Sequence, residues 1–400
     1  MRIQTPSSRT FVTALTAVAK CISPKNSIAI LDTILLSQAE DGRFFITGGS
    51  AEAMLTIPVD LSIVEGSWNN SVCLPTKMII PFLQTLPDIV VTFEFTEKNK
   101  FTIHYCTTAK ATVPDASASG GSAKNGKVDM PYIGAMEYPK FPKMEETIVH
   151  IALPGTVLSN QVSLARTFAA DDELRPVMNN VVLDVKYDEC TIVATDGHRL
   201  YKHVHSNADS DFYRKAPKDG AMVMLNKKAI AAMSVFAECE EVNIETDGKR
   251  IIVYADDMTY TMTVCEGRYP NYNSVIPHNQ QSVTVSKKEM LAVLKRVSLC
   301  CPETTHLIVL NYDGSMFLTI KAEDIDFAKA SEDQVLITQA NMQSNLRIGF
   351  KSTILAECIN ACDSEEVTIW LADSSRAAVI KPSDPNTPML ALCMPMMMND

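Results

Sequence analysis

The sequence predicts an α+β protein of three similar domains, each with two helices packed on antiparallel sheet. One observation is a repeat: an amphipathic helix, paired strands, a second helix and further strands follow one another three times along the chain. The other is the length of 400 residues, which suits roughly three domains of ~130 residues better than one core. A repeat period this long indicates repeated domains rather than a solenoid. We expect the domains at residues 1–146, 147–278 and 279–400.

The first helix of each repeat is predicted by apolar residues that recur at helical spacing. We expect these helices at residues 7–20, 154–169 and 286–299, each after a short β-like run. Ser286 followed by Glu289 is a capping box, and Ser7 is a candidate N-cap. The residues expected to face the core are Phe11, Leu15 and Val18; Leu158, Val162 and Ala165; and Met290, Leu294 and Val297.

The second helices are expected at residues 75–86, 226–237 and 351–362, and each leads into a strand, at 91–95, 242–246 and 367–371. The interval from first to second helix is 68, 72 and 65 residues, so the spacing persists although the residues differ. Thr76 and Asn226 are candidate N-caps. Pro81 lies inside its helix and should kink or shorten it, because proline removes a backbone hydrogen bond.

Turn residues separate the remaining strands and suit antiparallel meanders. These turns lie at Tyr187-Asp188, Thr246-Asp247-Gly248 and Tyr312-Asp313-Gly314. Residues 114–131 interrupt the first repeat, and because they are rich in Ser, Gly, Ala and Lys and poor in apolar residues, we expect a mobile surface loop.

Composition argues against several classes of protein. No apolar run reaches the ~18 residues of a membrane span, and the start lacks the apolar stretch of a signal peptide, so we expect a cytoplasmic protein. The eleven cysteines are scattered through apolar segments, as at Cys190, Cys239 and Cys358, which is typical of reduced buried thiols. There is no Cys-x-x-Cys, and neither Gly48-Gly49 nor Gly120-Gly121 opens a phosphate-binding motif. We therefore expect no metal, nucleotide or other cofactor.

The net charge of −11 argues by itself against a nucleic-acid partner, since phosphate binding needs Lys and Arg. The distribution of charge reverses that inference: the six helices hold eleven basic residues and two acidic ones, a net +9. If the helices share one surface, that surface is a basic stripe on an acidic body, as expected of a protein that contacts the DNA backbone. The alternative is that these residues merely decorate solvated helix faces, and charge alone does not decide between the two.

Several segments resemble one known family. They are Arg175–Asn180 (RPVMNN), Val193–Leu200 (VATDGHRL), Glu266–Tyr272 (EGRYPNY) with Val275-Ile276-Pro277, and Met394-Pro395-Met396. In this order and spacing they resemble the bacterial DNA polymerase III beta subunit, the beta sliding clamp. The resemblance covers the whole chain in organisation and is clear residue by residue in the second domain and at the C-terminus. The first domain matches by pattern, as at Ile30–Leu35 (ILDTIL).

The resemblance implies the DNA clamp fold: a head-to-tail homodimer whose six domains close into a ring around duplex DNA, with helices lining the hole. It implies a non-catalytic processivity subunit with no catalytic residues. Phosphate contacts carry no sequence information and permit sliding. Matching to the family gives the residues expected to face DNA: Lys25, Lys77, Arg175, Lys227, Lys228 and Lys351.

The resemblance also implies a hydrophobic cleft between the second and third domains that binds short linear peptides of DNA polymerase, the clamp loader and repair proteins. The matching positions, called the predicted cleft below, are Met178, Thr195, Gly197, His198, Arg199, Leu200, Pro270, Val275, Met394, Pro395 and Met396. Methionines suit a cleft that accepts several peptides, because they repack easily. Without the resemblance, the terminal methionines would be taken for a frayed end and Met178 for core.

The sequence departs from the family at Ser274, where a basic residue is common, at Pro176-Val177, which replace an aromatic pair of some members, and at Met397–Asp400, which extend the usual end. These departures bear on which peptides the cleft prefers. The dimer interface would join the first domain of one protomer to the third of the other, near Lys110 and Leu299-Cys300.

Two alternatives come from other classes. Asp196, His198, His203 and His205 could bind a metal or supply a general base in an enzyme, although no nucleophile or third carboxylate is evident. A repeat scaffold that binds only protein would not be retained on circular DNA.

Overall fold

The structure is a computed structural model that describes residues 1–68, 70–96, 99–107, 125–186, 189–206, 213–215, 220–343 and 345–398. The chain divides into two compact units, and each is described here by itself. Unit 1 comprises residues 1–159 and 228–264, and unit 2 comprises residues 160–227 and 265–400.

Unit 1 contains two antiparallel sheets. The smaller has the order β5 (Ser62–Glu65), β1 (Arg2–Thr5), β7 (Val91–Thr96), β8 (Lys100–Cys106) and β9 (Asn125–Pro131). The strands that unit 1 contributes to the larger sheet are, in order, β10 (Ile133–Gly134), β6 (Val72–Leu74), β2 (Ile34–Gln38), β3 (Phe44–Gly49), β4 (Ala53–Val59), β19 (Met258–Thr263), β18 (Arg250–Ala255), β17 (Val242–Thr246) and β11 (Val149–Leu153).

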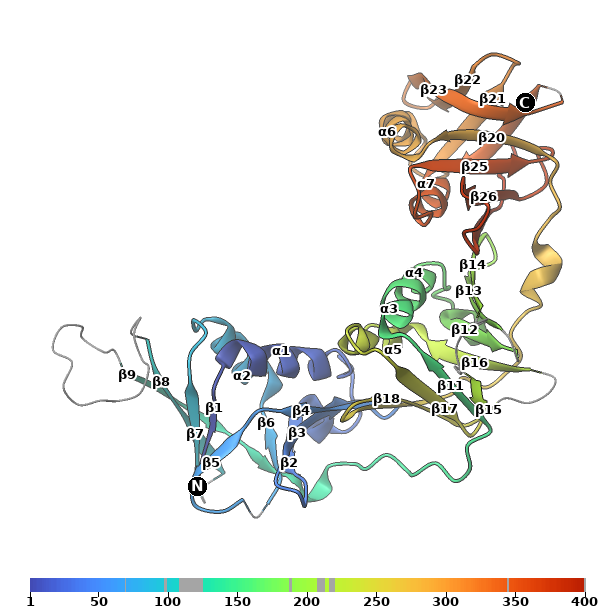
Figure 1. The fold of residues 1–400 in the computed structure, drawn as a ribbon. Helices are drawn as coiled ribbons and strands as arrows, with labels where there is room; N and C mark the ends of the chain where they lie inside the picture. Colours follow the sequence, from blue (N-terminus) through green and yellow to red (C-terminus); the bar gives the residue numbers. More distant parts are fainter. Residues whose placement is uncertain are drawn as a thin grey trace. The chain divides into compact units, whose positions relative to one another are not determined.

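Helices α1 (Ser8–Ala19) and α2 (Thr76–Gln84) lie side by side on unit 1 (Figure 1). The Ser7 hydroxyl accepts a hydrogen bond from the backbone N–H of Thr10, which confirms Ser7 as the N-cap of α1. Thr76 is the first helical residue rather than the N-cap, so that prediction was wrong; Pro75 precedes the helix without a side-chain cap. With Pro81 inside it, α2 ends at Gln84, two residues before its predicted end.

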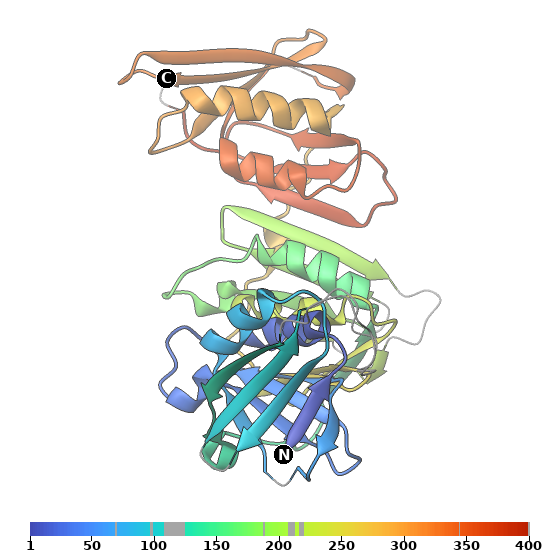
Figure 2. The same cartoon turned by 90° about the vertical axis from the view of Figure 1, so that its left-hand side faces the viewer.

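Unit 2 is built on one continuous antiparallel sheet. Its order is β16 (Ala221–Asn226), β12 (Asn180–Val185), β13 (Glu189–Thr195), β14 (Arg199–Ser206), β27 (Met389–Cys393), β26 (Ala378–Pro382), β25 (Glu366–Leu371), β20 (Gln281–Ser286), β23 (Lys329–Asn341), β22 (Phe317–Asp324), β21 (Leu307–Tyr312) and β24 (Leu346–Lys351). Helices α6 (Lys287–Val297) and α7 (Ser352–Asn360) lie side by side on it (Figure 2). Ser286 caps α6 by accepting from the N–H of Glu289, as predicted.

The core faces of the first helices are those predicted. The nine apolar residues expected to face inward on the three first helices are all buried. In the middle repeat the predicted helix 154–169 is three consecutive helical segments, α3 (Gly155–Val157), η3 (Leu158–Val162) and α4 (Ser163–Arg166). The helical spacing of apolar residues therefore identified the buried faces correctly, even where the helix is irregular.

The second helix of the middle repeat is shorter than the predicted 226–237. It consists of α5 (Lys227–Ile230) and η5 (Met233–Phe236). The Tyr260 hydroxyl donates to the carbonyl oxygen of Ala229 at 2.9 Å. A continuing α-helix would use this carbonyl for the N–H of Met233, so a residue distant in sequence competes for the bond that would extend the helix.

Two strand pairings join segments that the sequence assigns to different domains. Strand β4 pairs with β19, with Thr56 opposite Thr259 and Met54 opposite Thr261. Strand β14 pairs with β27, with Arg199 opposite Cys393. We call these pairings the first seam and the second seam. Because each sheet continues across its seam, the compact units follow the sheets, and the boundaries at 146 and 278 stay predictions.

The prediction of a loop at residues 114–131 is partly wrong. Residues 125–131 form β9, which pairs with β8 from Lys100 opposite Pro131 to Cys106 opposite Asn125. Backbone pairing with an existing strand thus outweighs a composition poor in apolar residues. Residues 114–124 lie outside the described residues, as do Tyr187-Asp188, whereas Gly248 and Gly314 adopt the positive φ of the predicted turns.

The remaining short elements are β15 (Tyr213–Lys215), η1 (Ala29–Asp32), η2 (Ala135–Glu137), η4 (Pro176–Asn179), η6 (Tyr272–Val275) and η7 (Ser298–Cys300). All eleven cysteines are free thiols. Burial raises the pKa of Cys190 to about 12, whereas Cys239 is only partly buried, unlike the prediction. Within the described ranges, no helix is long and apolar enough to cross a membrane.

Candidate functional site

The Thr195–Arg199 turn between β13 and β14 is fixed by its own side chains. The Thr195 hydroxyl donates to the Arg199 carbonyl at 2.7 Å and accepts from the Gly197 N–H at 3.1 Å. One oxygen of the Asp196 carboxylate accepts from the N–H groups of His198 and Arg199 at 2.8 and 3.0 Å. Gly197 has a φ of +92°, a conformation that glycine adopts without strain. The turn is therefore rigid before any partner binds.

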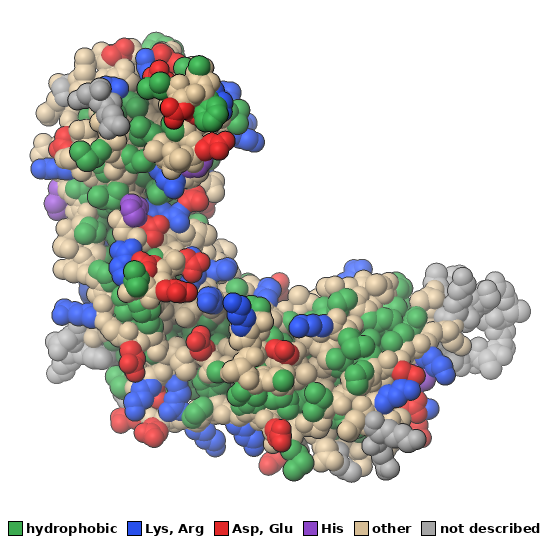
Figure 3. All heavy atoms as spheres, turned by 180° about the vertical axis from the view of Figure 1, so that it is seen from behind, with side chains coloured by type: hydrophobic (Ala, Val, Ile, Leu, Met, Phe, Trp, Pro, Cys, Tyr) green, Lys and Arg blue, Asp and Glu red, His purple; other side chains and the backbone are tan. Residues whose placement is uncertain are grey.

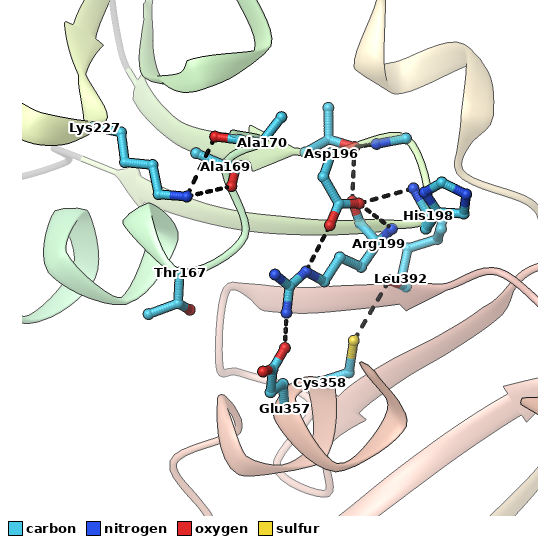
Figure 4. Close-up of polar contacts among 12 residues, drawn as sticks. Thr167, Ala169, Ala170, Asp196, His198, Arg199, Lys227, Glu357, Cys358 and Leu392 are labelled. Carbon is cyan, nitrogen blue, oxygen red and sulfur yellow. Dashed lines mark hydrogen bonds and ion pairs between the residues drawn. The ribbon is translucent and has the colours of Figure 1, made fainter. Parts of the chain in front are cut away.

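Arg199 ties this turn to a helix of the third repeat. Its Nε donates to the second Asp196 oxygen at 2.9 Å, and its Nη1 pairs with Glu357 on α7 (Figure 4). The guanidinium carbon lies 5.4 Å from the centre of the Phe168 ring. With its side chain only 16 % exposed, Arg199 is held on three sides and links the turn to α7.

The C-terminal tail and the connecting segment both contact the turn. The N–H of Met394 donates to the carbonyl of His198 at 2.8 Å, and the Tyr269 hydroxyl accepts from the N–H of Thr195 at 3.1 Å. Tyr269 is buried, and Pro270 after it is exposed. The structure thus brings the turn, the connecting segment and the start of the tail together.

The predicted cleft residues differ in accessibility. His198 is exposed, and Met394 is 41 % and Val275 56 % exposed. Met178 and Leu200 are buried, so they form the base of the site rather than its surface. A Cβ added to Gly197 would lie 3.8 Å from the Met178 Cε, which places Met178 directly beneath the turn.

The tail then leaves the turn. The N–H of Met396 donates to the carbonyl of Gly349 on β24 at 2.8 Å, so Pro395 lies between two backbone anchors. The tail is therefore ordered through Met396 rather than frayed. Of the extension 397–400, Asn399 and Asp400 lie outside the described residues.

Sequence reasoning missed residues that support the site. Lys202 on β14 donates to the Asn273 side chain at 3.2 Å and lies over the Tyr272 ring, which holds η6 with Val275 beside β14. Glu357 was missed because its partner Arg199 lies 158 positions earlier in the chain. Tyr269 could have been found, since a large aromatic residue beside proline in a connecting segment needs a buried place.

The six residues expected to face DNA have different local roles. Lys25, Lys77 and Lys228 are exposed. Arg175 is exposed and donates to Asp172 at 2.8 Å. Lys351 is half-buried at the start of α7. Lys227 is half-buried, and its ammonium donates to the carbonyls of Ala169 and Ala170 at 3.1 and 3.3 Å (Figure 4).

Some of the basic residues on the helices bind backbone carbonyls of the protein itself. Lys227 binds the carbonyls of Ala169 and Ala170, which lie three and four residues after α4 ends, whereas Lys287 on α6 binds the carbonyls of Asn360 and Cys362 at the end of α7. Cations are favourable there because the last carbonyls of a helix carry partial negative charge. On the face that Figure 3 presents, basic side chains are interspersed with acidic and apolar ones. The stripe is therefore partly structural.

The geometry does not favour the enzyme alternative. Both oxygens of Asp196 are occupied by the turn and by Arg199. Burial and the neighbouring His205 lower the pKa of His203 to about 4, which makes it a weak base near pH 7. Among the residues that the structure describes, no group of three or more His, Cys, Asp or Glu side chains is placed to hold a metal ion.

Comparison with known families gives three matches in succession. The N-terminal domain of the DNA polymerase III beta subunit matches residues 4–119, the central domain matches 152–271, and the C-terminal domain matches 273–397. Together the matches span nearly the whole chain in the family's own order.

Individual relatives are distant but full-length. The chain is 24 % identical over 374 residues to the beta sliding clamp of Haemophilus influenzae, covering 92 % of each, and 24 % identical over 383 residues to that of Synechococcus elongatus, covering 93 % of each. A crystal structure of the Pseudomonas aeruginosa sliding clamp bound to griselimycin shares the fold with a TM-score of 0.84 at 19 % identity, and the Bacillus subtilis clamp with 0.81 at 20 %, each over all of both chains. From the three domain matches, the chain belongs to the DNA polymerase III beta subunit family, the beta sliding clamps.

Proposed function

We propose that this chain forms a head-to-tail homodimer that closes into a ring around duplex DNA. The family function is that of a sliding clamp, a non-catalytic processivity factor for DNA polymerase III. The observation that carries the proposal is the threefold repeat, matched in order by the three domains of the family. Two chains supply six similar domains, and a head-to-tail contact closes a ring when the rotation between subunits is complete.

DNA contacts in this ring are weak and sequence-independent. Lys25, Lys77 and Lys228 are exposed, and Arg175 and Lys227 share their charge with Asp172 and with backbone carbonyls. A cation that already has a local partner gives up part of that interaction to contact a phosphate. Sliding needs phosphate contacts that break easily, and topology rather than affinity keeps the ring on DNA.

The predicted cleft holds DNA polymerase, the clamp loader and repair proteins through short linear peptides. The rigid Thr195–Arg199 turn supports this role because a pre-organised site loses little entropy on binding. Met394 supplies a partly exposed apolar surface next to His198, with buried Met178 beneath the turn. Flexible methionines let one site accept several sequences.

The subunit contact is proposed between the first domain of one protomer and the third domain of the other. Leu299 in η7 supports this location, because its side chain is 77 % exposed in a single chain, and an apolar residue this accessible suits an interface. Cys300 beside it is half-buried, and Lys110 lies outside the described residues. A replication factor of this kind works in the cytoplasm, where we place this protein.

Retention on circular DNA tests the function. The protein is loaded onto nicked circles by a clamp loader, the complex is isolated, and retention is measured before and after the circle is linearised, with the mass in solution determined alongside. Release on cutting, together with a dimer mass, supports a ring held by topology. Retention after cutting, or a monomer, refutes the ring, and no retention at all favours a protein-only scaffold.

Lys228→Glu tests the DNA-facing assignment. It should weaken retention and reduce the slope of log affinity against log salt concentration by about one. The matched control is Lys381→Glu, which reverses an exposed charge on β26 and should leave the slope unchanged. Equal slopes for both variants would show that Lys228 does not face DNA.

A further inference from the structure

The first seam carries two adjoining hollows that the functions above do not use. Their volumes are about 340 and 360 Å³, and both are bordered by Met54 and by Pro139, Lys140 and Phe141. This size lies within the range of protein sites that bind small ligands. Every residue that lines them belongs to unit 1, so the hollows are a feature of one compact body.

The strand pattern of the first seam makes a floor for these hollows. Leu55 and Tyr260 lie opposite each other and are fully buried, so the alternate residues point to the other side of the sheet. That side presents Met54, Thr56 and Thr261. The segment from η2 to β11 runs along this side, opposite α1 (Figure 1). The floor is therefore mixed, with a thioether and hydroxyl groups.

The connecting segment over the floor is anchored at both ends. At one end, Tyr138 is 7 % exposed, packs with Leu31 and Cys73, and its hydroxyl donates to the carbonyl of Thr47 at 3.4 Å. At the other end, the Arg250 guanidinium donates to the carbonyl of Lys143. Pro139 and Pro142 between the anchors restrict the backbone. The hollows are thus preformed.

The arrangement repeats that of the predicted cleft. Both seams join the third strand after a first helix to the last strand of the next repeat, as β4 with β19 and β14 with β27. Each connecting segment contains a buried tyrosine followed by proline. The tyrosine hydroxyl bonds to the backbone of the strand that precedes the seam strand, Tyr138 to Thr47 on β3 and Tyr269 to Thr195 on β13.

A second copy of the Thr-Asp-Gly-x-Arg turn borders the first seam. In this copy the Thr246 hydroxyl donates to the Arg250 carbonyl at 2.6 Å and accepts from Gly248 at 3.0 Å, and Asp247 accepts from the N–H groups of Lys249 and Arg250. These are the bonds of the Thr195–Arg199 turn. Lys249 and Arg250, the last two residues of this turn, line the second hollow. His198 and Arg199 occupy the same positions in the other turn and belong to the predicted cleft.

The charge around the hollows selects the ligand. Lys140 and Lys249 are exposed, Arg250 is paired with Asp247 at 3.6 Å, and none of the residues that line the two hollows, all within the described chain, is acidic. Met54, Pro139 and Phe141 supply the apolar surface. Threonine hydroxyls on the floor can bond to a peptide backbone. We propose that the first seam is a second peptide site, which takes an apolar side chain flanked by acidic residues.

A photoreactive peptide tests this site on the full-length protein. The probe has benzoylphenylalanine beside leucine at its centre, three glutamates on each side and a fluorescent label, and a matched probe replaces every glutamate by glutamine. We expect saturable binding of the acidic probe, cross-links within residues 139–142 or 249–263, and weaker binding of the neutral probe. Cross-links confined to residues 195–200 and 394–398, or no saturable binding, would overturn the proposal.

Two variants locate the interaction. Lys140→Glu with Lys249→Glu should weaken the acidic probe by about tenfold or more, whereas Lys329→Glu with Lys381→Glu, an equal charge change in unit 2, should not. Thr261→Trp fills the floor without changing charge and should abolish the cross-links while the thermal unfolding midpoint is retained. Equal loss in the unit 2 control, or displacement of the probe by duplex DNA from the first seam, would contradict a peptide site. Retention on nicked circles should stay normal in these variants. The peptide-binding assay therefore tests this proposal independently of the proposed ring.

Discussion

Removing the Arg199 side chain gives the sharpest test of how the site is held together. In Arg199→Ala, Asp196 loses a charge-assisted hydrogen bond of 2.9 Å, worth about 2 kcal/mol. The contact of the guanidinium with Phe168 adds about 1 kcal/mol. The pair with Glu357, whose side chain is 52 % exposed, adds at most about 0.5 kcal/mol. We expect unit 2 to lose about 3 kcal/mol of unfolding free energy.

The two tryptophans allow this loss to be assigned to one unit. Trp68 lies in unit 1 and Trp370 in unit 2. In a Trp68→Phe background, urea unfolding followed by Trp370 fluorescence should shift to lower urea by about 1 M, for a slope of about 3 kcal/mol per M. The same shift should accompany weaker binding of a polymerase peptide, because the turn loses its support.

Arg250→Ala is the matched control, since Arg250 occupies the same position in the second copy of the turn. In a Trp370→Phe background, Arg250→Ala should shift the unfolding transition that Trp68 fluorescence reports. In the Trp68→Phe background, it should leave the Trp370 transition unchanged. The reasoning fails if Arg199→Ala changes the Trp370 transition by less than about 0.5 kcal/mol, or if Arg250→Ala shifts the Trp370 transition equally.

Three further predictions concern other parts of the chain. Deleting Met394–Asp400 should abolish binding of a polymerase peptide in fluorescence anisotropy while the dimer mass and retention on circular DNA persist; loss of the dimer would refute our placement of the tail. Because the pKa of His203 is lowered to about 4 in the folded state, its neutral form stabilises the fold above the unfolded pKa of about 6.5, and about 2–3 kcal/mol should be lost between pH 6.5 and 4; His203→Gln should flatten this dependence in urea titrations, and an unchanged slope would contradict it. A Cβ at Gly155 would lie 1.9 Å from the Phe236 carbonyl oxygen, whereas one at Gly134 meets nothing within 4 Å, so Gly155→Ala should cost about 3 kcal/mol or more and Gly134→Ala less than about 0.5, and similar melting temperatures for both would refute the close packing at Gly155.

The sequence predicted what depends on local periodicity. The spacing of Phe11, Leu15 and Val18 identified a buried helix face because side chains three or four residues apart share one side of a helix. Ser286 was recognised as a cap for the same reason, since it bonds a group only three residues away. The repeat itself was visible because such local patterns recur in order.

What the sequence could not give depends on contacts between distant residues. The break in the second helix of the middle repeat follows from Tyr260, which lies 31 positions after Ala229. Strand β9 forms because β8 offers it free backbone groups, although its own composition is that of a loop. In the site, the family resemblance supplied the positions of Arg199 and Met394, but not the role of Glu357. The turn at Thr246-Asp247-Gly248 was predicted from its residues, but its match to the bonds of the Thr195–Arg199 turn was not.

The continuity of the sheet through the first seam means that the covalent link between the first two repeats is not what keeps them together. Backbone bonds from Thr259 opposite Thr56 to Met262 opposite Ala53 cross the junction, and Tyr260 is buried beneath it. A protease cut within residues 139–142 should therefore leave two fragments that migrate as one particle under native conditions and separate only in denaturant. The same property would let the gene be divided at this point, with the two halves made separately and joined by strand pairing.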